Sequence, residues 1–372
     1  MAKEKHLVIL VPGFLGFKQI GSFRYFEKYN KILRRELSLH GIRATIVVKR
    51  PLPTSSLFDR AQDLLKTAYE LFKPGEFERI HFIGHSTGGI DIRLALDPAI
   101  RLSKKRGVNR QNTIMRTFLR RSLGARVSIA APHLGTPLAT PFYVMGFGFT
   151  SVPFNAVTRA MSKGAFPFEL LLKLFGNTPN ARRDLERWSR TMNRAGFSPD
   201  EIGRLIKYAF SVAVDRRAIV DLTPLHLGRL KGKALNLGAD SPHCYSILTI
   251  APRPDPERLL KMKNRLLDTP LYLAFAIPWM VTGYFPAHRS FPKLDEDVLT
   301  GIGYTKPAPA RHDSDGIVPT LSQPWGKVVA IVEGDHLDVI GHQGVIACGK
   351  HFGKKELTSM VSTIARCLAE SS

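Results

Sequence analysis

The chain has 372 residues, of which 44% are hydrophobic, 23% charged and 9% aromatic. This composition is typical of a folded globular protein and excludes the disordered, collagenous and coiled-coil classes. The formal net charge of +23 predicts attraction to anionic partners but no particular chemistry. The three cysteines (Cys244, Cys348 and Cys367) are an odd set without a CxxC pair. They argue against a disulfide framework or a zinc ribbon and favour a reducing compartment.

Apolar strand-like segments and amphipathic helix-like segments alternate along the chain. Strands are expected at 6–11, 44–48, 79–83, 126–131, 245–250 and 327–332. Helices are expected at about 22–39 and 57–72, directly after residue 86, and at the end of the chain at 357–368. Continuous apolar strands that alternate with helices are typical of a mostly parallel sheet with helices on both faces. The fold class is therefore α/β.

A long block at about 142–233 interrupts this pattern between two expected strands. The letters SPDE at 198–201 have the N-cap serine, the proline and the glutamate that mark a helix start. We therefore expect a helical lid or cap at 142–233, inserted into a core that occupies 1–141 and 234–372.

A second insertion, at about 252–310, is rich in proline and basic residues. It contains the uncharged stretch 269–287, which has Pro278 in its middle. Proline disrupts the continuous helix that a membrane span needs, so we expect a buried or interface-lying segment there. The apolar run at 6–11 is too short for a secretory signal, which predicts a cytoplasmic location with membrane association as an option.

A basic insertion is expected at about 99–125. Residues 98–168 contain no Asp or Glu, and nine Lys or Arg side chains lie between 101 and 126. Such a stretch predicts contact with a polyanion or with lipid headgroups, and a solvated basic loop explains the composition equally well.

The most informative motif is Gly84-His85-Ser86-Thr87-Gly88, which follows the strand expected at 79–83. Small residues around a serine allow a strand to turn sharply into a helix, which exposes the hydroxyl at the carboxyl end of the sheet. A serine hydroxyl attacks an ester only when a base removes its proton, and the base is oriented by a carboxylate. A histidine and an acid are therefore expected later in the chain.

His336, after the last expected strand, is the best-placed base, and Asp315 in a turn-rich segment is the best-placed acid. Together they give the chain order Ser86, Asp315, His336. The tetrahedral intermediate also needs two backbone donors, for which the sequence offers the N–H groups of Thr87 and Phe14. The alternatives to these acid and base residues are Asp313, Asp335, Asp338, His312 and His342.

The motifs VPGFLG, GHSTGG, AAPHLGTPLA, DSDGIVP and GDHLDVIGH follow in this order. In order and approximate spacing the chain resembles the bacterial triacylglycerol lipases and esterases of the α/β-hydrolase superfamily over about half its length. The resemblance implies Ser86 as nucleophile, Asp315 as acid, His336 as base and Phe14 with Thr87 as oxyanion donors. It also implies that the block at 142–233 is a mobile lid over an acyl pocket. The chain departs from the family at Pro12, where the family commonly has a histidine.

The resemblance implies hydrolysis of apolar acyl esters, such as acylglycerols, through an acyl-enzyme. Lipase, phospholipase, thioesterase, polyester depolymerase and acyltransferase activities use the same triad, so the sequence does not separate them. The alternative function is that of a non-catalytic protein of the same fold, which binds anionic membrane or nucleic acid through its basic surface. An ester-cleaving enzyme would meet an apolar substrate and, transiently, a lipid interface or anionic membrane, rather than nucleic acid.

No cofactor is required for this chemistry, and calcium is an open option. Some relatives hold calcium with an Asp two residues after the catalytic histidine, a position that Asp338 matches here. Asp295 and Asp297 are the nearby candidates for a second carboxylate ligand.

Overall fold

A six-stranded sheet forms the centre of the computed structural model, which describes residues 5–13, 19–20, 23–26, 29–49, 55–139, 217–227, 242–252, 282, 291–341 and 352–371. The strands follow the order β4-β1-β5-β6-β7-β8, and every pairing is parallel. Their bounds are β1 (Lys5–Val11), β4 (Arg43–Val48), β5 (Arg79–His85), β6 (Leu123–Ile129), β7 (Cys244–Ile250) and β8 (Lys327–Glu333). The expected mostly parallel α/β sheet is confirmed.

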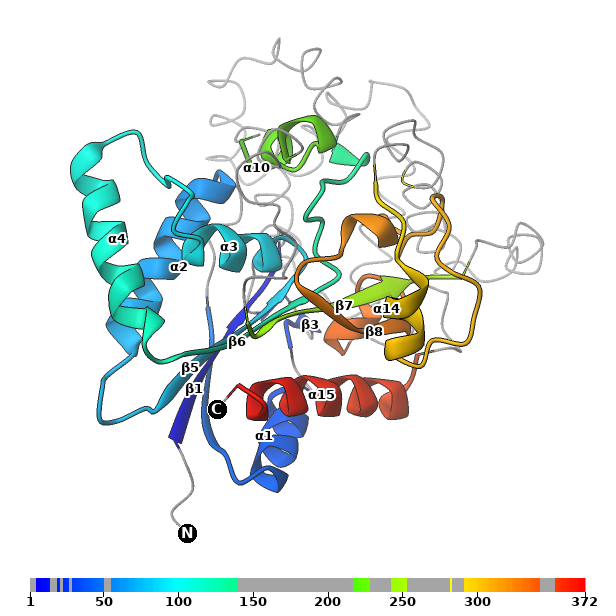
Figure 1. Cartoon of the computed structure of the whole chain (residues 1–372), viewed down its shortest axis with the longest axis horizontal. Helices are drawn as coiled ribbons and strands as arrows, with labels where there is room; N and C mark the ends of the chain where they lie inside the picture. The colour runs from blue at the N-terminus through cyan, green and yellow to red at the C-terminus, as the bar shows by residue number, and fades with distance from the viewer. Residues whose placement is uncertain are drawn as a thin grey trace, which may run out of the picture.

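Helices cover both faces of this sheet (Figure 1). One face carries α1 (Tyr29–Leu39) and α15 (Lys354–Ala369), and the other carries α2 (Leu57–Leu71), α3 (Thr87–Leu96) and α4 (Arg106–Arg120). The alternation of side chains in β1 explains why two cores form. Leu7 and Ile9 pack with α2 and α3, whereas Val8 and Leu10 pack with α1 and α15, as expected for a strand with period two.

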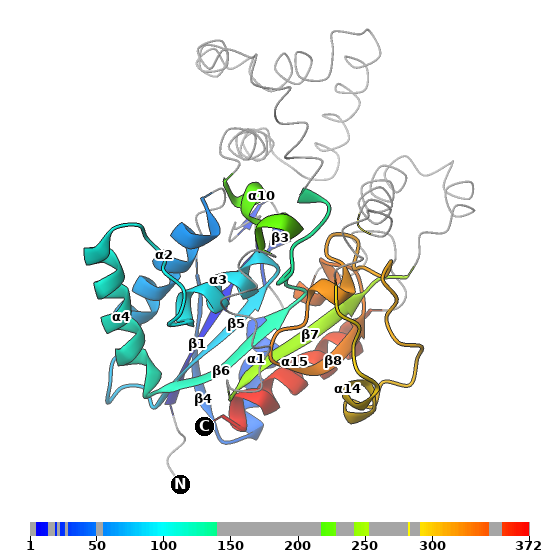
Figure 2. The same cartoon turned by 45° about the horizontal axis from the view of Figure 1, so that its top comes forward.

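The shorter elements lie around this core. They are the antiparallel pair β2 (Gln19–Ile20) and β3 (Phe23–Arg24), helices α10 (Arg217–Asp221) and α14 (Glu296–Gly301), and the 3₁₀ turns η2 (Thr320–Ser322) and η3 (Asp338–Ile340). Because all six strands are parallel, their carboxyl ends lie at the same edge of the sheet (Figure 2). Carboxyl ends of parallel strands are where α/β proteins bind their ligands.

The first helix begins later than the sequence predicts. The prediction placed its start at about residue 22, but residues 23–24 belong to β3 and α1 begins at Tyr29. Phe26 has a φ of 60°, a left-handed conformation that a right-handed helix cannot contain. The basic segment at 99–125 also differs from a plain loop, because residues 106–120 form the helix α4.

The expected cap at 142–233 lies outside the described residues except for 217–227, so it and the division of the chain into core and cap stay predictions. Within the described ranges, no helix is long and apolar enough to cross a membrane. The stretch 269–287 lies outside those ranges except for Thr282.

Candidate active site

Ser86 lies at the sharp turn between β5 and α3. Its φ of 56° and ψ of −130° are unusual for a residue with a side chain and cost on the order of 1–3 kcal/mol. The turn is held by its own backbone, because the Ser86 N–H donates to the Ile129 carbonyl at 2.9 Å and the Ser86 carbonyl accepts from the Gly89 N–H at 3.0 Å. Strained residues of this kind concentrate at functional sites, which makes Ser86 a candidate nucleophile.

Glycines on both sides of Ser86 make this turn possible. A Cβ on Gly84 would lie 2.5 Å from the backbone of Gly88, and a Cβ on Gly88 would lie 2.1 Å from the Val11 carbonyl oxygen. Real Cβ atoms do not approach backbone so closely, so both positions exclude any side chain. The parallel register pairs Val11 with Gly84, which brings the loop after β1 next to Ser86.

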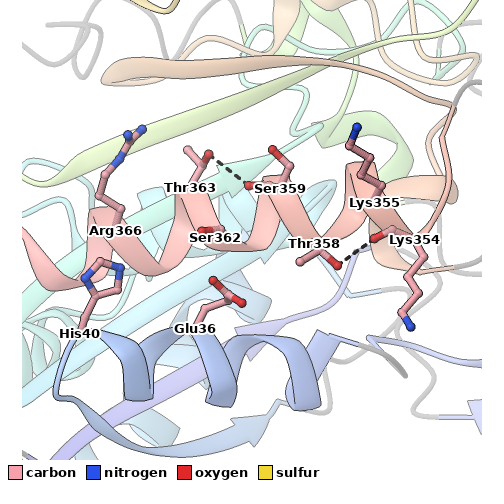
Figure 3. Close-up of a pocket in the computed structure, with 9 residues that line it drawn as sticks. All are labelled: Glu36, His40, Lys354, Lys355, Thr358, Ser359, Ser362, Thr363 and Arg366. Carbon is pink, nitrogen blue, oxygen red and sulfur yellow. Dashed lines mark hydrogen bonds between the residues drawn. The ribbon is translucent and has the colours of Figure 1, made fainter.

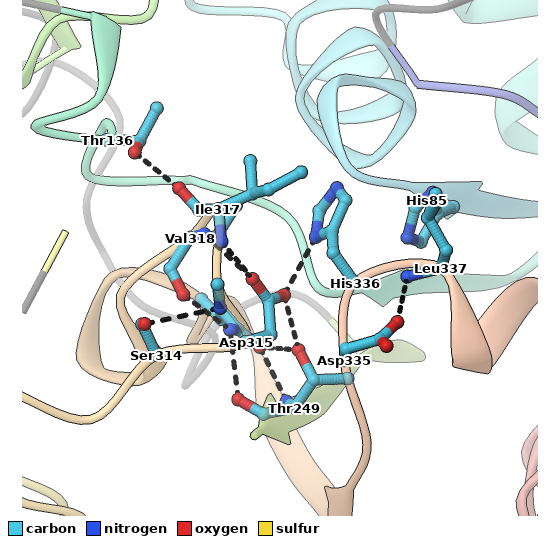
Figure 4. Close-up of polar contacts among 12 residues, drawn as sticks. His85, Thr136, Thr249, Ser314, Asp315, Ile317, Val318, Asp335, His336 and Leu337 are labelled. Atoms are coloured by element: carbon cyan, nitrogen blue, oxygen red, sulfur yellow. Dashed lines mark hydrogen bonds and ion pairs between the residues drawn. The ribbon is translucent and has the colours of Figure 1, made fainter. Parts of the chain in front are cut away.

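Asp315 and His336 form a buried pair at the ends of β7 and β8 (Figure 4). His336 Nδ1 lies 2.8 Å from Asp315 Oδ2, and Oδ2 also accepts the Thr249 hydroxyl at 2.7 Å. The other oxygen, Oδ1, accepts the N–H groups of Ile317 at 3.0 Å and Val318 at 2.8 Å. These contacts fix the carboxylate, which in turn selects the imidazole tautomer with its proton on Nδ1 and a free lone pair on Nε2.

The turn that carries His336 is closed by two neighbouring acids. Asp335 Oδ1 accepts the N–H groups of Leu337 at 2.8 Å and Asp338 at 2.9 Å, while Asp338 Oδ2 accepts the Asp335 N–H at 3.1 Å. Burial raises the pKa of Asp335 to about 7, with a further contribution from the charge of Asp338. Asp335 and Asp338 therefore close the turn that carries His336, while the carboxylate on His336 Nδ1 is that of Asp315.

The other alternative residues lie elsewhere. His312 is half exposed at 52% and its Nε2 is 3.6 Å from Asp313, whose second oxygen accepts the Ala310 N–H at 2.7 Å. His342 lies outside the described residues, as does Phe14, so the structure does not place these two.

His336 lies directly beside the residue that precedes Ser86. The ring centroids of His85 and His336 are 4.5 Å apart, and Figure 4 shows the two rings side by side. Ser86 and His336 do not hydrogen-bond to each other in the described part of the chain. Catalytic hydrogen bonds are often long in ligand-free enzymes and tighten when substrate binds.

Sequence reasoning did not identify two further residues of the site, Tyr25 and His85. The Gly13 N–H donates to Tyr25 Oη at 2.9 Å, and Tyr25 Oη lies 2.6 Å from His85 Nδ1. The Tyr25 hydroxyl thus connects the Gly13 backbone to the His85 ring. Burial, together with the charge of His336, places the pKa of His85 well below its usual value, which keeps this ring neutral and able to accept. No sequence motif marks this chain of contacts.

The backbone around Ser86 offers donors for an oxyanion. A Cβ on Gly13 would lie 3.1 Å from Ser86 Oγ, so the loop after β1 closely approaches the hydroxyl. The Thr87 N–H, at the first position of α3, donates to no other group among the described residues. Free N–H groups at a helix start favour negative charge.

A buried ion pair underlies both of these backbone segments. Arg60 on α2 and Asp91 on α3 are 2% and 1% exposed, and Arg60 Nη2 lies 2.6 Å from Asp91 Oδ2. The same Nη2 donates to the Thr87 hydroxyl at 3.2 Å and to the Pro12 carbonyl at 3.4 Å. One guanidinium therefore ties the loop after β1 to the start of α3.

The structure does not test the expectation of calcium. Within the described ranges, no group of three or more His, Cys, Asp or Glu side chains could hold a metal ion. Asp338 contributes to the turn before η3, while Asp295 and Asp297 lie at the start of α14.

Residues 1–163 match the profile of the family described as "Putative serine esterase (DUF676)". The chain is therefore similar to this family over less than half of its length. The match agrees with the resemblance to serine esterases that the motifs indicated, and it includes Ser86 but neither Asp315 nor His336. No curated protein matches the sequence.

Several solved lipase and esterase structures are similar to this chain. The Staphylococcus hyicus lipase is 18% identical with a TM-score of 0.48, and the comparison covers 99% of this chain and 96% of that chain. EstA from Clostridium botulinum is 17% identical with a TM-score of 0.48, covering 99% and 88%. Lipase 1 from Pelosinus fermentans is 17% identical with a TM-score of 0.46, covering 100% of each.

Proposed function

We propose that this protein is a serine carboxylic-ester hydrolase of the α/β-hydrolase fold that cleaves apolar acyl esters, such as acylglycerols, through an acyl-enzyme. The observation that supports the proposal is the pairing of two features at one edge of the sheet. Ser86 occupies a strained turn at the end of β5, and the ring of His336, whose Nδ1 contacts Asp315, lies beside the ring of His85, the residue before Ser86.

In the proposed reaction, Ser86 Oγ attacks the ester carbonyl while His336 Nε2 removes its proton. Asp315 stabilises the imidazolium that forms and does not itself take up the proton. The Thr87 N–H and an N–H of the loop after β1, for which Phe14 is the proposed residue, stabilise the oxyanion. His336 then returns the proton to the leaving alcohol. A water molecule, activated by the same histidine, releases the acyl group and restores Ser86.

The ester-hydrolase class is supported by the match of residues 1–163 to the serine esterase family, and the preference for apolar esters by the resemblance of the motifs to triacylglycerol lipases. We also retain the segment at 142–233 as the proposed lid and acyl-binding region. A panel of p-nitrophenyl esters and acylglycerols of increasing chain length, run with and without a chelator, measures the acyl preference and any calcium requirement together.

The triad is tested by replacing its members one at a time. Ser86→Ala should lower kcat by on the order of a millionfold and abolish labelling by a fluorophosphonate, because the nucleophile is lost. Asp315→Asn should lower kcat by roughly 10⁴, because the imidazole tautomer is no longer selected. Ser359→Ala, an exposed serine on α15, is the matched control and should leave turnover unchanged.

Full ester turnover by Ser86→Ala would overturn the assignment. So would the absence of both turnover and fluorophosphonate labelling in the wild-type protein, which would favour the alternative of a non-catalytic protein of the same fold.

A further inference from the structure

The outer face of helix α4 combines exposed apolar side chains with unpaired cations. Ile114 is 56% exposed and Phe118 is 36% exposed, although apolar side chains of this size are usually buried. The surface around them is basic. We define the α4 surface as the exposed residues Arg106, Arg110, Ile114, Phe118, Arg120 and Arg121.

The spacing along the helix places cations and apolar groups on one stripe. Arg110, Ile114 and Arg121 are separated by four and then seven positions, which is the spacing of residues that lie above one another on a helix. The opposite side of α4 is buried at Asn112 and Leu119. The helix is thus amphipathic, with its basic face turned to solvent. This face is unusual because it also carries the exposed apolar side chains Ile114 and Phe118.

Helix α4 is held rigidly while it presents this face. The Arg116 guanidinium donates to the carbonyls of Ala95 at 2.7 Å, Ile100 at 2.9 Å and Leu94 at 2.9 Å, which fixes α4 to the end of α3. On the neighbouring helix, Tyr69 makes an edge contact with Phe118, with ring centroids 4.9 Å apart. Tyr69 is itself 39% exposed, so the apolar patch continues from α4 onto α2.

The cations of the α4 surface have no carboxylate to neutralise them. Across the part of the chain that the structure describes, none of its four arginines forms an ion pair, and residues 98–168 contain no acidic side chain at all. The acids of α2 have partners of their own, since Glu70 pairs with Lys66, Asp59 with Arg217 and Asp63 with Lys49. The surface therefore carries a net positive charge that an external anion can meet.

We propose that the α4 surface docks on an anionic lipid membrane, with α4 lying in the plane of the interface. Lys and Arg near such a surface are each attracted to anionic lipid, and exposed apolar groups between them enter the headgroup and acyl boundary. The apolar groups distinguish this partner from nucleic acid, because phosphate contacts would leave Ile114 and Phe118 against a charged backbone.

The opposite face of the sheet supplies a matched control (Figure 3). There, α1 and α15 border a groove of about 820 Å³ that is lined by hydroxyl and basic side chains, including Lys354, Lys355 and Arg366. Lys354 and Lys355 are exposed, so replacing them removes the same charge as replacing two arginines of the α4 surface.

The test measures partition of the full chain onto vesicles of equimolar phosphatidylglycerol and phosphatidylcholine. Arg110→Gln with Arg121→Gln should weaken binding by about 30-fold, from about a kilocalorie per mole for each lost cation. Lys354→Gln with Lys355→Gln should change it less than the arginine pair does. Equal losses in the two double variants, or strong binding to pure phosphatidylcholine, would overturn the proposal.

A second variant tests the apolar contact and separates lipid from nucleic acid. Ile114→Trp should retain binding, and its fluorescence should shift to shorter wavelength on the anionic vesicles but not on phosphatidylcholine alone. Ile114→Ser should weaken vesicle binding. An unshifted tryptophan, or binding to duplex DNA that exceeds vesicle binding and is unaffected by Ile114→Ser, would contradict a membrane partner. These measurements do not depend on turnover. They therefore test membrane docking even if the protein shows no esterase activity.

Discussion

The Tyr25 hydroxyl anchors the loop after β1. The lipases and esterases that the motifs resemble commonly have a histidine before the glycine of this loop, where this chain has Pro12. In this chain the Tyr25 hydroxyl holds the Gly13 N–H at 2.9 Å and reaches His85 Nδ1 at 2.6 Å. The loop after β1 is thus attached to the residue beside Ser86. The side chain that anchors the loop comes from a different part of the chain.

Tyr25→Phe should lower kcat by roughly 10- to 100-fold and change KM little, because a displaced oxyanion loop weakens binding of the transition state only. The affinity for a boronic acid, whose serine adduct mimics the tetrahedral intermediate, should fall by a similar factor. Tyr304→Phe, in a loop far along the chain, serves as the control. Unchanged boronate affinity in folded Tyr25→Phe protein would contradict this role for Tyr25.

The buried Arg60–Asp91 ion pair joins helix α2 to helix α3 beneath the candidate site. Burial raises the pKa of Asp91, and the charge of Arg60 opposes that effect. A buried pair contributes little net stability, but removing one partner leaves an uncompensated charge in the interior. The pair therefore makes the relative placement of the two helices sensitive to either side chain.

Arg60→Leu should destabilise the protein by about 3–5 kcal/mol, because Asp91 then remains buried without its partner. The double variant Arg60→Leu with Asp91→Leu should recover most of that loss, since both charges are gone. Urea unfolding of the three proteins measures the difference. A double variant that is no more stable than Arg60→Leu would show that the pair acts through packing rather than through charge.

The strands were predictable because each is a short apolar run that alternates with a helix, and the turn at Ser86 was predictable because its glycines are adjacent in sequence. Local patterns of this kind carry their own signal. Contacts between distant residues do not: Tyr25 and His85 are 60 positions apart, and nothing in either segment indicates the other. Helix α4 was missed for another reason. Its buried side includes the polar Asn112, and its many arginines made the segment stand out by charge rather than by an apolar stripe.

Neutral buried histidines link the stability of the whole molecule to pH. Burial places the pKa of His81, His85 and His133 well below the usual value. The contacts of His81 show why a further proton is unfavourable. Its Nδ1 accepts the Ala125 N–H at 3.0 Å, so its proton lies on Nε2, which donates to His6 Nδ1 at 3.0 Å. Protonation of Nδ1 would place two N–H groups against each other.

Stability should therefore fall as the pH is lowered through about 6.5, because the unfolded chain then binds three protons that the folded chain does not. Each histidine contributes about 1.4 kcal/mol per pH unit. Asp335 opposes one of them, since its pKa is raised to about 7 and the folded state keeps a proton that the unfolded state releases. Three histidines outweigh one aspartic acid, so the folded state should lose stability between about pH 6 and pH 5. Urea unfolding across this range measures the slope. His133→Gln should make the slope shallower by up to about 1.4 kcal/mol per pH unit, and a flat profile in the wild-type protein would show that these histidines are protonated in the fold.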